Sequence, residues 1–419
     1  MTDDLAALEA VWERTDTLFG LLDPADLGTR AIPLRHPFLF YLGHLPAFAW
    51  NHIGAGVLGR PPFHADLDTL FARGIDPDDE DAASARGKSA WPGVDEVVAY
   101  REGIRRAIRE AVPQLESHPD PYAAMIVPLV LEHERMHHET LLYMIARVPP
   151  ERLHAPAAWS APRLSARVPP VSRIEVEAGE VVLGAERSSL RFGWDNEFPT
   201  EVVSVPAFEL DDRPVTVGDW RRFVDAGGYR NPKLWSDNDW SWRRRQGIDH
   251  PDAWRRADGA WQVRSLFAWH DADAVAGWPV YVSLAEARAW CAWAGTRLPL
   301  EAELHRAAYT HAGTVDGAYD FRAHAPMPVD AFSANGRGFR DLVGNGWEWT
   351  GTPFLPRPSF EAHLRTYPGY SSDFFDGAHF VVFGASWATE RCFLRPSFRN
   401  WYQHRYPYAW TTFRTAGPN

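Results

Sequence analysis

One stretch of the chain reads Leu131-Glu132-His133-Glu134-Arg135-Met136-His137-His138-Glu139-Thr140, inside an apolar run from Ala123 to Val148. His133 and His137 are four residues apart, so a helix of about 3.6 residues per turn presents both imidazoles on nearly the same face. Two imidazoles so placed can bind one metal ion. Because burying them among apolar side chains without a ligand would cost several kcal/mol, the pattern favours a metal site over a pair of ordinary core histidines.

The same letters match the His-Glu-x-x-His motif of zinc proteases, in which Glu134 would activate a metal-bound water. The extended form of that motif requires glycine at position 140 and histidine at position 143, where this chain has Thr140 and Tyr143. The chain after Val148 is also interrupted by repeated prolines. A zinc hydrolase is therefore the minor alternative.

Four segments either carry apolar residues at helical spacing or are apolar almost throughout. They are Asp3–Leu22, Pro37–Trp50, Val94–Leu115 and Pro121–Val148. Four such helices predict an N-terminal bundle with a metal in its core. His44 lies in the apolar middle of the second segment, and we prefer it to His36 and His52 as the third ligand.

Composition narrows the classes of partner. The chain has 419 residues, enough for two domains, and its Lys+Arg 43 against Asp+Glu 55 gives a net charge of -12, which argues against nucleic acid and anionic membranes. The acidic N-terminus lacks a signal-peptide core and no apolar run is long enough to span a bilayer, so we expect a cytoplasmic protein. The chain has only 2 cysteines, so neither a disulfide scaffold nor a cysteine-rich metal site is expected. The number of tryptophans, 20, is unusually high and points weakly to a polar or cationic small-molecule ligand.

The second half of the chain has a different texture. A proline-rich linker is predicted over residues 151–172, followed by a domain over 173–419 with short strands between Gly, Pro and Asp. The expected strands are Arg173–Glu177, Val181–Leu183, Val202–Val205 and Val280–Val282. A helix over Leu284–Ala294 is expected to begin at a capping box formed by Ser283 and Glu286, whereas Trp235–Arg256 is interpreted as a solvated surface loop.

Several motifs in this half carry a family resemblance. They are Asp195-Asn196-Glu197-Phe198-Pro199, Arg213-Pro214-Val215-Thr216, Gly295-Thr296-Arg297-Leu298-Pro299, Gly344-Asn345-Gly346-Trp347-Glu348-Trp349-Thr350, Gly384-Ala385-Ser386-Trp387 and Phe413-Arg414. Together they resemble the formylglycine-generating-enzyme fold, a variant of the C-type lectin architecture. The paired catalytic cysteines of those enzymes are absent, because Cys291 falls within a predicted helix and Cys392 stands alone. Their thiol and copper chemistry is therefore not expected here.

Residues 1–150 resemble a DinB-like four-helix bundle, so the expected fold class is α+β, with the bundle followed by a C-type-lectin-like domain. This pairing is similar to the ergothioneine and ovothiol sulfoxide synthases and their relative, selenoneine synthase. The resemblance implies Fe(II) bound by His44, His133 and His137, with O2 as co-substrate. Three imidazoles on an octahedral ferrous ion leave three positions for substrate imidazole, chalcogen donor and dioxygen. The implied reaction is oxidative carbon–chalcogen bond formation on the imidazole ring of hercynine, Nα-trimethylhistidine.

The same resemblance suggests residues for the substrate and for catalysis. A tyrosine would supply a proton or an electron during dioxygen activation, and Tyr367 and Tyr370 are the candidates. Asn400 and Trp401, in the segment Ser397-Phe398-Arg399-Asn400-Trp401, would face hercynine, with the indole ring of Trp401 on the trimethylammonium group. A lectin-like binding module is the competing class, and such a module would be indifferent to the three histidines.

The chain departs from the family pattern where the donor is expected to bind. Synthases that use γ-glutamylcysteine resemble one another in an arginine pair and in an aspartate after Asn-Trp, where this chain has only Arg86 and has Tyr402. A doubly charged thiol would lose its bidentate partners, so the donor is predicted to be cysteine or a neutral seleno-sugar. We favour the selenoneine synthase branch, because Tyr402 and the tryptophans suit stacking on a pyranose. Gly346 is interpreted as enlarging the space around its motif.

Overall fold

The computed structural model describes residues 3–72, 91–309 and 316–418 of the chain. It divides the chain into two compact units, Met1–Pro156 and Ala157–Asn419, each with a core of its own. Within the described residues, every helix is too short or too polar to cross a membrane.

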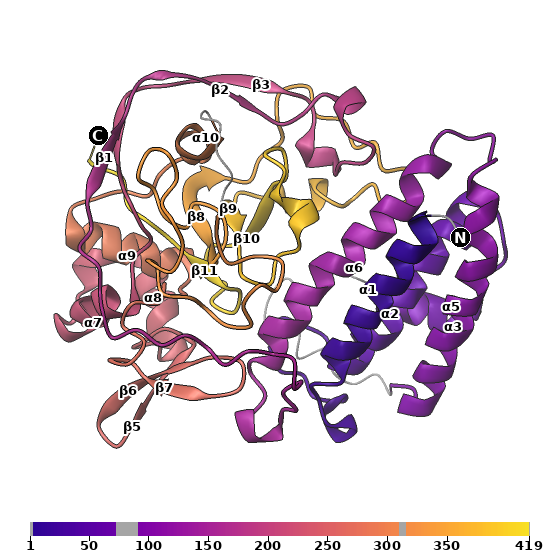
Figure 1. The fold of residues 1–419 in the computed structure, drawn as a ribbon, viewed down its shortest axis with the longest axis horizontal. Helices are drawn as coiled ribbons and strands as arrows, with labels where there is room; N and C mark the ends of the chain where they lie inside the picture. Colours follow the sequence, from indigo (N-terminus) through magenta and orange to yellow (C-terminus); the bar gives the residue numbers. More distant parts are fainter. Residues whose placement is uncertain (1–2, 73–90, 310–315, 419) are drawn as a thin grey trace. The chain divides into compact units, whose positions relative to one another are not determined.

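The first unit is a helical bundle, as predicted, drawn in indigo to purple in Figure 1. Its helices are α1 (Asp3–Phe19), α2 (Phe38–Trp50), α3 (Ala65–Ala72), α5 (Val94–Leu115) and α6 (Ala123–Ile145). Every residue of α2 is buried, whereas α5 buries one stripe and exposes the rest. This difference follows from composition: α2 is apolar all round and becomes a core element, while α5 is amphipathic.

Long side chains of one helix occupy the space left by small residues of another. A Cβ atom added to Gly43 of α2 would lie 2.5 Å from Cε2 of Phe71 on α3. The phenyl ring of Phe71 is fully buried and packs directly against the α2 backbone. The glycine beside His44 therefore sets how closely α3 approaches α2.

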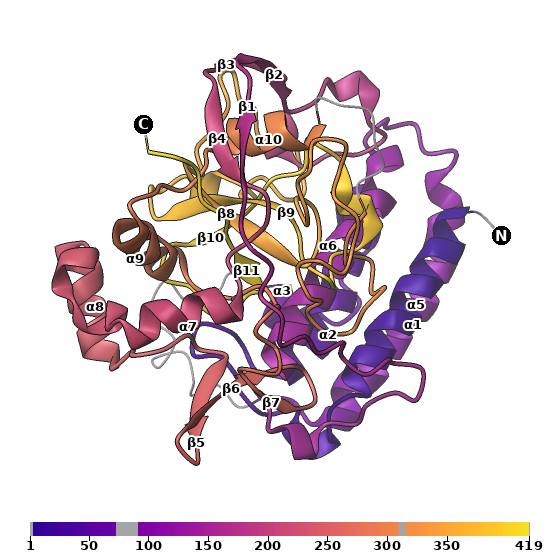
Figure 2. The same ribbon diagram turned by 60° about the vertical axis from the view of Figure 1, so that its left-hand side comes forward.

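The second unit is built around a four-stranded sheet with the order β10-β9-β8-β11, visible in Figures 1 and 2. Its strands are β8 (Gly346–Pro353), β9 (His379–Ala385), β10 (Asn400–Gln403) and β11 (Thr411–Thr412). The β8–β9 and β9–β10 pairs are antiparallel and β11 runs parallel to β8. The motif that contains Trp347 and Trp349 thus lies in the middle of the sheet, which explains its buried aromatic residues.

In the described part of this unit, two ribbons, a small sheet and four α-helices accompany the central sheet. The ribbons pair β1 (Arg173–Val176) with β4 (Phe208–Asp211) and β2 (Gly179–Leu183) with β3 (Glu201–Val205). The sheet contains β5 (Trp254–Ala257), β6 (Ala260–Arg264) and β7 (Trp269–Asp271). The helices are α7 (Val217–Asp225), α8 (Asp237–Gln246), α9 (Leu284–Ala294) and α10 (Glu301–Tyr309).

Most of the tryptophans that pointed to a ligand belong to the core of this unit. Trp220, Trp278 and Trp349 are fully buried, and the rings of Trp220 and Trp290 are stacked with centroids 5.5 Å apart. The tryptophan content therefore reflects packing in a sheet-poor domain more than ligand binding.

The capping box of α9 is confirmed. The hydroxyl of Ser283 accepts from the backbone N–H of Glu286, and the carboxylate of Glu286 accepts from the backbone N–H of Ser283 at 2.8 Å. The helix ends at Gly295, whose positive φ of 68° suits glycine. Local sequence signals alone were sufficient for this element.

Two secondary-structure predictions were wrong. Val280–Val282 is an extended buried segment without a ladder, because the N–H of Val280 donates to Val215 and that of Val282 donates to Thr411. Part of Trp235–Arg256 is the helix α8, because Ser236 caps its start and its basic last turn stabilises its C-terminal end. Its polar composition concealed the helix.

The interpretation of Gly346 was also wrong. A Cβ atom at this position would lie 2.9 Å from Cγ2 of Thr412 and 3.0 Å from Cε1 of Tyr281. Tyr281 is fixed there by its hydroxyl, which donates to the carbonyl of Asn345 at 2.6 Å. The glycine accommodates these two side chains and leaves no extra space for a ligand.

Candidate functional site

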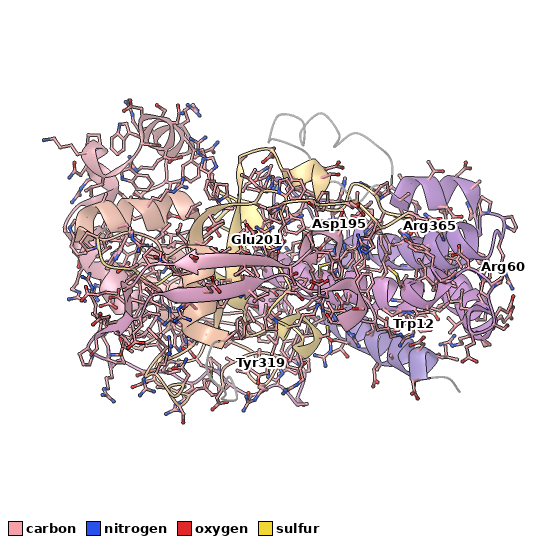
Figure 3. All side chains as sticks on the ribbon, turned by 90° about the horizontal axis from the view of Figure 1, so that it is seen from above. Trp12, Arg60, Asp195, Glu201, Tyr319 and Arg365 are labelled. Atoms are coloured by element: carbon pink, nitrogen blue, oxygen red, sulfur yellow. The ribbon has the colours of Figure 1, made fainter. Side chains whose placement is uncertain are left out.

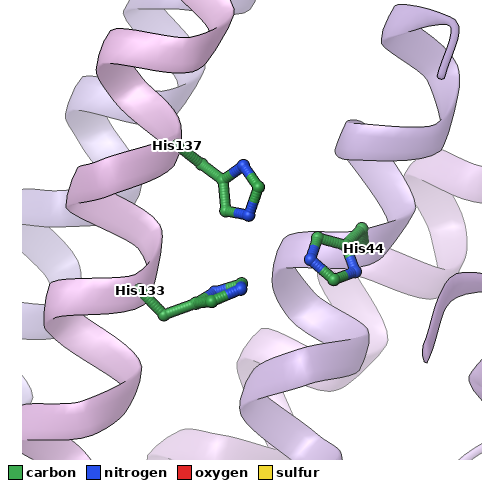
Figure 4. Close-up of side chains that lie close together, drawn as sticks. All are labelled: His44, His133 and His137. Atoms are coloured by element: carbon green, nitrogen blue, oxygen red, sulfur yellow. The ribbon is translucent and has the colours of Figure 1, made fainter. Parts of the chain in front are cut away.

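Three histidine side chains converge in the core of the bundle, as Figure 4 shows. His133 and His137 project from successive turns of α6, and His44 projects from α2. One nitrogen of each imidazole lies within 4.8 Å of a nitrogen of the other two. The ring centroids are 5.1 Å apart for His44 and His133, 5.1 Å for His44 and His137, and 4.6 Å for His133 and His137. The structure thus brings together the three residues predicted to bind metal.

The orientation of His44 leaves one nitrogen available for a ligand. Its Nδ1 lies 2.7 Å from the carbonyl oxygen of Phe71. Because a carbonyl only accepts, Nδ1 carries the hydrogen and Nε2 presents a lone pair. This Nε2 is buried and has no hydrogen-bond partner among the described residues, and the same is true of Nδ1 of His137. The buried Nε2 of His44, an acceptor without a partner among the described residues, fits a metal ion that prefers imidazole nitrogen.

Burial keeps these imidazoles neutral. It lowers the pKa of His44 to about 4 and lowers the pKa of His133 and of His137 well below the usual value, with neighbouring histidines adding to the effect. The ring of Phe48 lies parallel to that of His133, with centroids 3.4 Å apart. The histidines therefore need no deprotonation before they bind a metal.

Glu134 does not join this cluster. Its Oε1 accepts from the hydroxyl of Thr15 on α1 at 2.5 Å, and the same hydroxyl lies 2.9 Å from Nε2 of His138. Thr15, Glu134 and His138 are all buried. Among the described residues, the candidate metal cluster contains histidines alone. This arrangement does not supply the carboxylate base that a His-Glu-x-x-His hydrolase requires.

The second unit gathers several of the other predicted residues in an aromatic cluster. The ring of Trp401, on β10, is stacked on Phe354 with centroids 4.0 Å apart and an interplanar angle of 9°. It also contacts Tyr370 at 5.4 Å and Phe374 at 5.5 Å. The cluster therefore positions Trp401 between rings, with its side chain only partly buried.

The two candidate tyrosines lie next to each other in this cluster. The rings of Tyr367 and Tyr370 are 5.6 Å apart, and Tyr370 is stacked on Trp194 at 3.9 Å. Burial, together with the nearby carboxylates of Asp373 and Asp195, raises the pKa of Tyr367 to about 12. The Tyr367 phenol therefore holds its proton at neutral pH.

Asn400 and Tyr402 alternate with Trp401 along β10, so they lie on the opposite face of that strand. The Oδ1 of Asn400 accepts from the backbone N–H of Trp401 at 2.9 Å, and Tyr402 is stacked on Tyr406 at 5.5 Å. The structure thus separates both Asn400 and Tyr402 from the face that carries Trp401, against the prediction that Asn400 and Trp401 face hercynine together. Arg86 lies outside the described residues.

Some features of these sites could not be read from the sequence. The hydrogen bond from His44 to Phe71 uses a backbone carbonyl, which has no side-chain signature. Likewise, Asp195 accepts a hydrogen bond from the hydroxyl of Ser371, far along the chain. The Asp-Asn-Glu motif contributed to the family resemblance, but nothing local linked it to the tyrosines.

Comparisons with known proteins agree with this architecture. Residues 161–418 match the sulfatase-modifying factor enzyme 1-like domain, and residues 7–147 match the DinB superfamily. The hercynine oxygenase of Mycobacterium tuberculosis is 35% identical over 323 residues, which cover 72% of this chain and 73% of that protein. The hercynine oxygenase of Mycolicibacterium smegmatis is 32% identical over 428 residues, covering 96% and 94%. Ergothioneine biosynthesis protein 1 of Schizosaccharomyces pombe is 29% identical over 434 residues, covering 93% of this chain but 53% of that longer protein.

The fold and these matches define a two-domain protein in which a DinB-type bundle precedes a sulfatase-modifying-factor-like domain. The chain belongs to the family of the hercynine oxygenases, the ergothioneine sulfoxide synthases, and is an oxidative enzyme. The family and the fold class predicted from the sequence are thus confirmed.

Proposed function

We propose that this chain catalyses oxidative carbon–selenium or carbon–sulfur bond formation on the imidazole ring of hercynine, with Fe(II) as cofactor and O2 as oxidant. The observation that carries the proposal is the convergence of His44, His133 and His137. The names of the relatives support hercynine as the substrate. In the reaction, an imidazole C–H bond and the donor Se–H or S–H bond are replaced by one carbon–chalcogen bond. One oxygen atom of O2 is transferred to the chalcogen. The other oxygen atom leaves as water with the two hydrogens removed from carbon and from the donor.

The three histidines would hold the iron through neutral imidazoles. A bound ferrous ion would supply redox capacity and open coordination positions for the two substrates and dioxygen. The hydrogen bond between His44 and the Phe71 carbonyl would fix the first of these ligands in a single tautomer. The stacking of Phe48 on His133 would restrain the imidazole of His133, the second proposed ligand.

Residues of the second unit would bind hercynine and move a proton. The partly buried indole of Trp401 suits a trimethylammonium group, whose charge is attracted to the faces of aromatic rings. Tyr367 or Tyr370 would transfer a proton from its phenolic oxygen, and the raised pKa of Tyr367 keeps that proton available at neutral pH. Asn400 lies on the face of β10 opposite Trp401, so we leave it out of the proposed hercynine contacts.

For the donor, we propose a neutral seleno-sugar, which makes the chain a selenoneine synthase. Tyr402 at a position where the family pattern expects aspartate supports an uncharged donor, as does the lone Arg86. The ergothioneine-type reaction with cysteine or γ-glutamylcysteine is the second candidate, supported by the relative named for ergothioneine biosynthesis. The hydrolase alternative loses support because Glu134 is bonded to Thr15.

A donor competition tests the proposal. The chain is loaded with Fe(II) without oxygen, and hercynine is added with seleno-N-acetylglucosamine, cysteine and γ-glutamylcysteine in equal amounts. Air is then admitted and the products are analysed by mass spectrometry. A selenium isotope pattern on an imidazole adduct is the expected result. A dominant cysteinyl sulfoxide would retain the iron enzyme but overturn the donor, and no oxygen-dependent adduct would overturn the proposal.

Removing a ligand tests the metal centre separately. His137→Ala is expected to lower bound iron below half of the wild-type amount and to reduce adduct formation at least 100-fold. His154→Ala is the matched control, because His154 belongs to the same unit and is exposed. Equal iron content in wild type and His137→Ala would contradict the assigned ligands, whatever the activity.

A further inference from the structure

A buried polar contact lies directly beside the two candidate tyrosines. The hydroxyl of Ser371 donates to Oδ1 of Asp195, which Figure 3 labels, and accepts from Nδ2 of Asn196 at 2.8 Å. Ser371 and Asp195 are completely buried and Asn196 is 1% exposed. The hydroxyl of Ser371, the residue after Tyr370, is thus hydrogen-bonded to two side chains of the Asp-Asn-Glu motif.

The motif forms a firmly held turn. Asp195–Glu197 is one turn of 3-10 helix, and the carboxylate of Glu197 accepts from Arg395 at 2.6 and 2.7 Å and from Ser397 at 2.6 Å. It also accepts from the backbone N–H of Trp194 at 2.8 Å. With both charged partners largely buried, this network makes the turn a rigid support.

The opposing segment contacts this support at two consecutive positions. The ring of Tyr370 is stacked on Trp194 at 3.9 Å, and the next residue, Ser371, bonds to the two residues after Trp194. A short turn connects Tyr370 to Tyr367, since the N–H of Tyr370 donates to the carbonyl of Tyr367 at 3.3 Å. A displacement of Ser371 would therefore move both tyrosines.

The contact is also costly in a way that simple packing does not require. Oδ2 of Asp195 and Oδ1 of Asn196 are buried and have no hydrogen-bond partner among the described residues. A buried polar atom left without a partner lowers stability, and such atoms gather where a protein trades stability for geometry. Two of them at one turn, beside Tyr370, point to a role in positioning.

We propose that Asp195, Asn196 and Ser371 are positioning residues that hold Tyr367 and Tyr370 in the orientation the reaction requires. The inference rests on the proposed function, because it assumes that one of these tyrosines transfers the proton. It adds three residues to the machinery of the enzyme that act through a neighbour without touching the substrate.

The first test observes the tyrosines without any metal or substrate. The chain is labelled with 3-fluorotyrosine, and Tyr367→Phe and Tyr370→Phe assign the two fluorine resonances. Ser371→Ala is expected to shift or broaden both of them in the otherwise folded chain. Ser372→Ala is the matched control, because Ser372 lies in the same turn with an exposed side chain. Unchanged fluorine spectra in Ser371→Ala would overturn the inference.

Asp195→Asn provides a second variant in case Ser371→Ala does not fold. The substitution keeps the size of the side chain but replaces a charged acceptor with a neutral one, which weakens the bond from Ser371. It is expected to shift the same two resonances by a smaller amount. If the spectra of both Asp195→Asn and Asn196→Ala match wild type, the positioning role is excluded.

The second test is a double-mutant cycle on turnover. A misplacement of about 1 Å can cost about 100-fold, so Ser371→Ala is expected to lower kcat about 10- to 100-fold with the hercynine KM changed less than threefold. In the background that lacks the catalytic tyrosine, Ser371→Ala should have no further effect on kcat. Equal losses in wild type and in both tyrosine variants would contradict positioning.

The two tests separate the inference from the function on which it rests. Wild-type kcat in both Tyr367→Phe and Tyr370→Phe would show that neither phenol acts, so the tyrosine role in the proposed function would fail. A normal fluorine spectrum in Ser371→Ala, together with a large loss in one tyrosine variant, would leave that function standing and remove only the positioning residues.

Discussion

At the scale of single residues, the candidate sites depend on which polar atoms have partners. His44 donates to a backbone carbonyl through Nδ1 and keeps Nε2 without a partner among the described residues. Asp195 accepts from Ser371 through Oδ1, whereas its buried Oδ2 has no hydrogen-bond partner among the described residues. In both cases the unpaired atom costs stability, and in the first it is the atom that would bind the proposed metal.

Asp195 also gives the chain a measurable dependence of stability on pH. Burial raises the pKa of Asp195 from 3.8 to about 6 in the folded state. Between these values the folded chain binds more protons than the unfolded chain, so this contribution is full below pH 3.8 and is lost as pH rises through 6. At 1.36 kcal/mol per unit, the loss is at most about 3 kcal/mol.

Urea unfolding of wild type and Asp195→Asn between pH 4 and 7 measures this loss, with the difference between the two chains expected to change by up to about 3 kcal/mol. Asp376→Asn is the control. The hydrogen bond from His379 lowers the pKa of Asp376 below 3.8, so its difference from wild type should stay constant between pH 4 and 7. A constant difference for Asp195→Asn across the range would rule out the buried, titrating carboxyl.

At the scale of elements, the candidate metal ligands come together only if two helices approach closely. His133 and His137 share one helix, so their spacing is set by the helix itself, whereas His44 reaches them only if α2 packs correctly. The ring of Phe71 on α3 lies against Gly43, and the carbonyl of the same Phe71 orients His44. One contact between α2 and α3 therefore sets both packing and ligand orientation.

Gly43→Ala tests this contact. The added methyl group would lie 2.5 Å from the ring of Phe71, so the two helices must separate, at a cost of about 1–3 kcal/mol. Because the Phe71 carbonyl moves with its ring, we also expect iron affinity to fall about tenfold in a metal titration.

Gly28→Ala is the control for this prediction, because a Cβ atom at Gly28 has no neighbour within 4 Å. It is expected to leave iron affinity unchanged and to stabilise the chain, if anything, by reducing the freedom of the unfolded state. Equal iron affinities of Gly43→Ala and wild type would separate the packing of α2 from the geometry of the metal centre.

At the scale of the whole molecule, each unit has a core of its own, and the second is unusual in relying on buried ion pairs. Arg414 and Glu348 are fully buried and bonded to each other at 2.6 Å. Arg414 also donates to the carbonyls of Asp211 in β4 and of Arg340, so it joins the β1–β4 ribbon to the central sheet, which it contacts through Glu348 on β8. Breaking such a pair leaves an uncompensated charge in the core.

Arg414→Met is therefore expected to destabilise the chain by about 3–5 kcal/mol in urea unfolding. The control is Arg109→Met, which removes an exposed partner of Glu9 and should cost no more than about 1 kcal/mol. If Arg414→Met and Glu348→Gln together restore wild-type stability, the loss in the single variant came from the unpaired carboxylate. A loss below about 1 kcal/mol would contradict the role of the pair.

Several parts of this protein followed from local sequence alone. The spacing of His133 and His137, the apolar stripe of Val94–Leu115 and the capping box at Ser283 each lie within a few turns of helix, where periodicity and hydrogen bonding decide the structure. The family motifs added the fold class. Helix α8 was missed because its composition is polar, although its caps were present in the sequence.

Contacts between distant segments were decided by the tertiary structure. The approach of His44 to α6, the carbonyl of Phe71 and the bond between Asp195 and Ser371 join residues without any shared local pattern. Val280–Val282 also could not be predicted from its local sequence. Its composition is typical of a strand, but its backbone is hydrogen-bonded to two different segments and forms no ladder. Periodicity reports which face of an element is buried, but only packing determines which side chain of another element meets it.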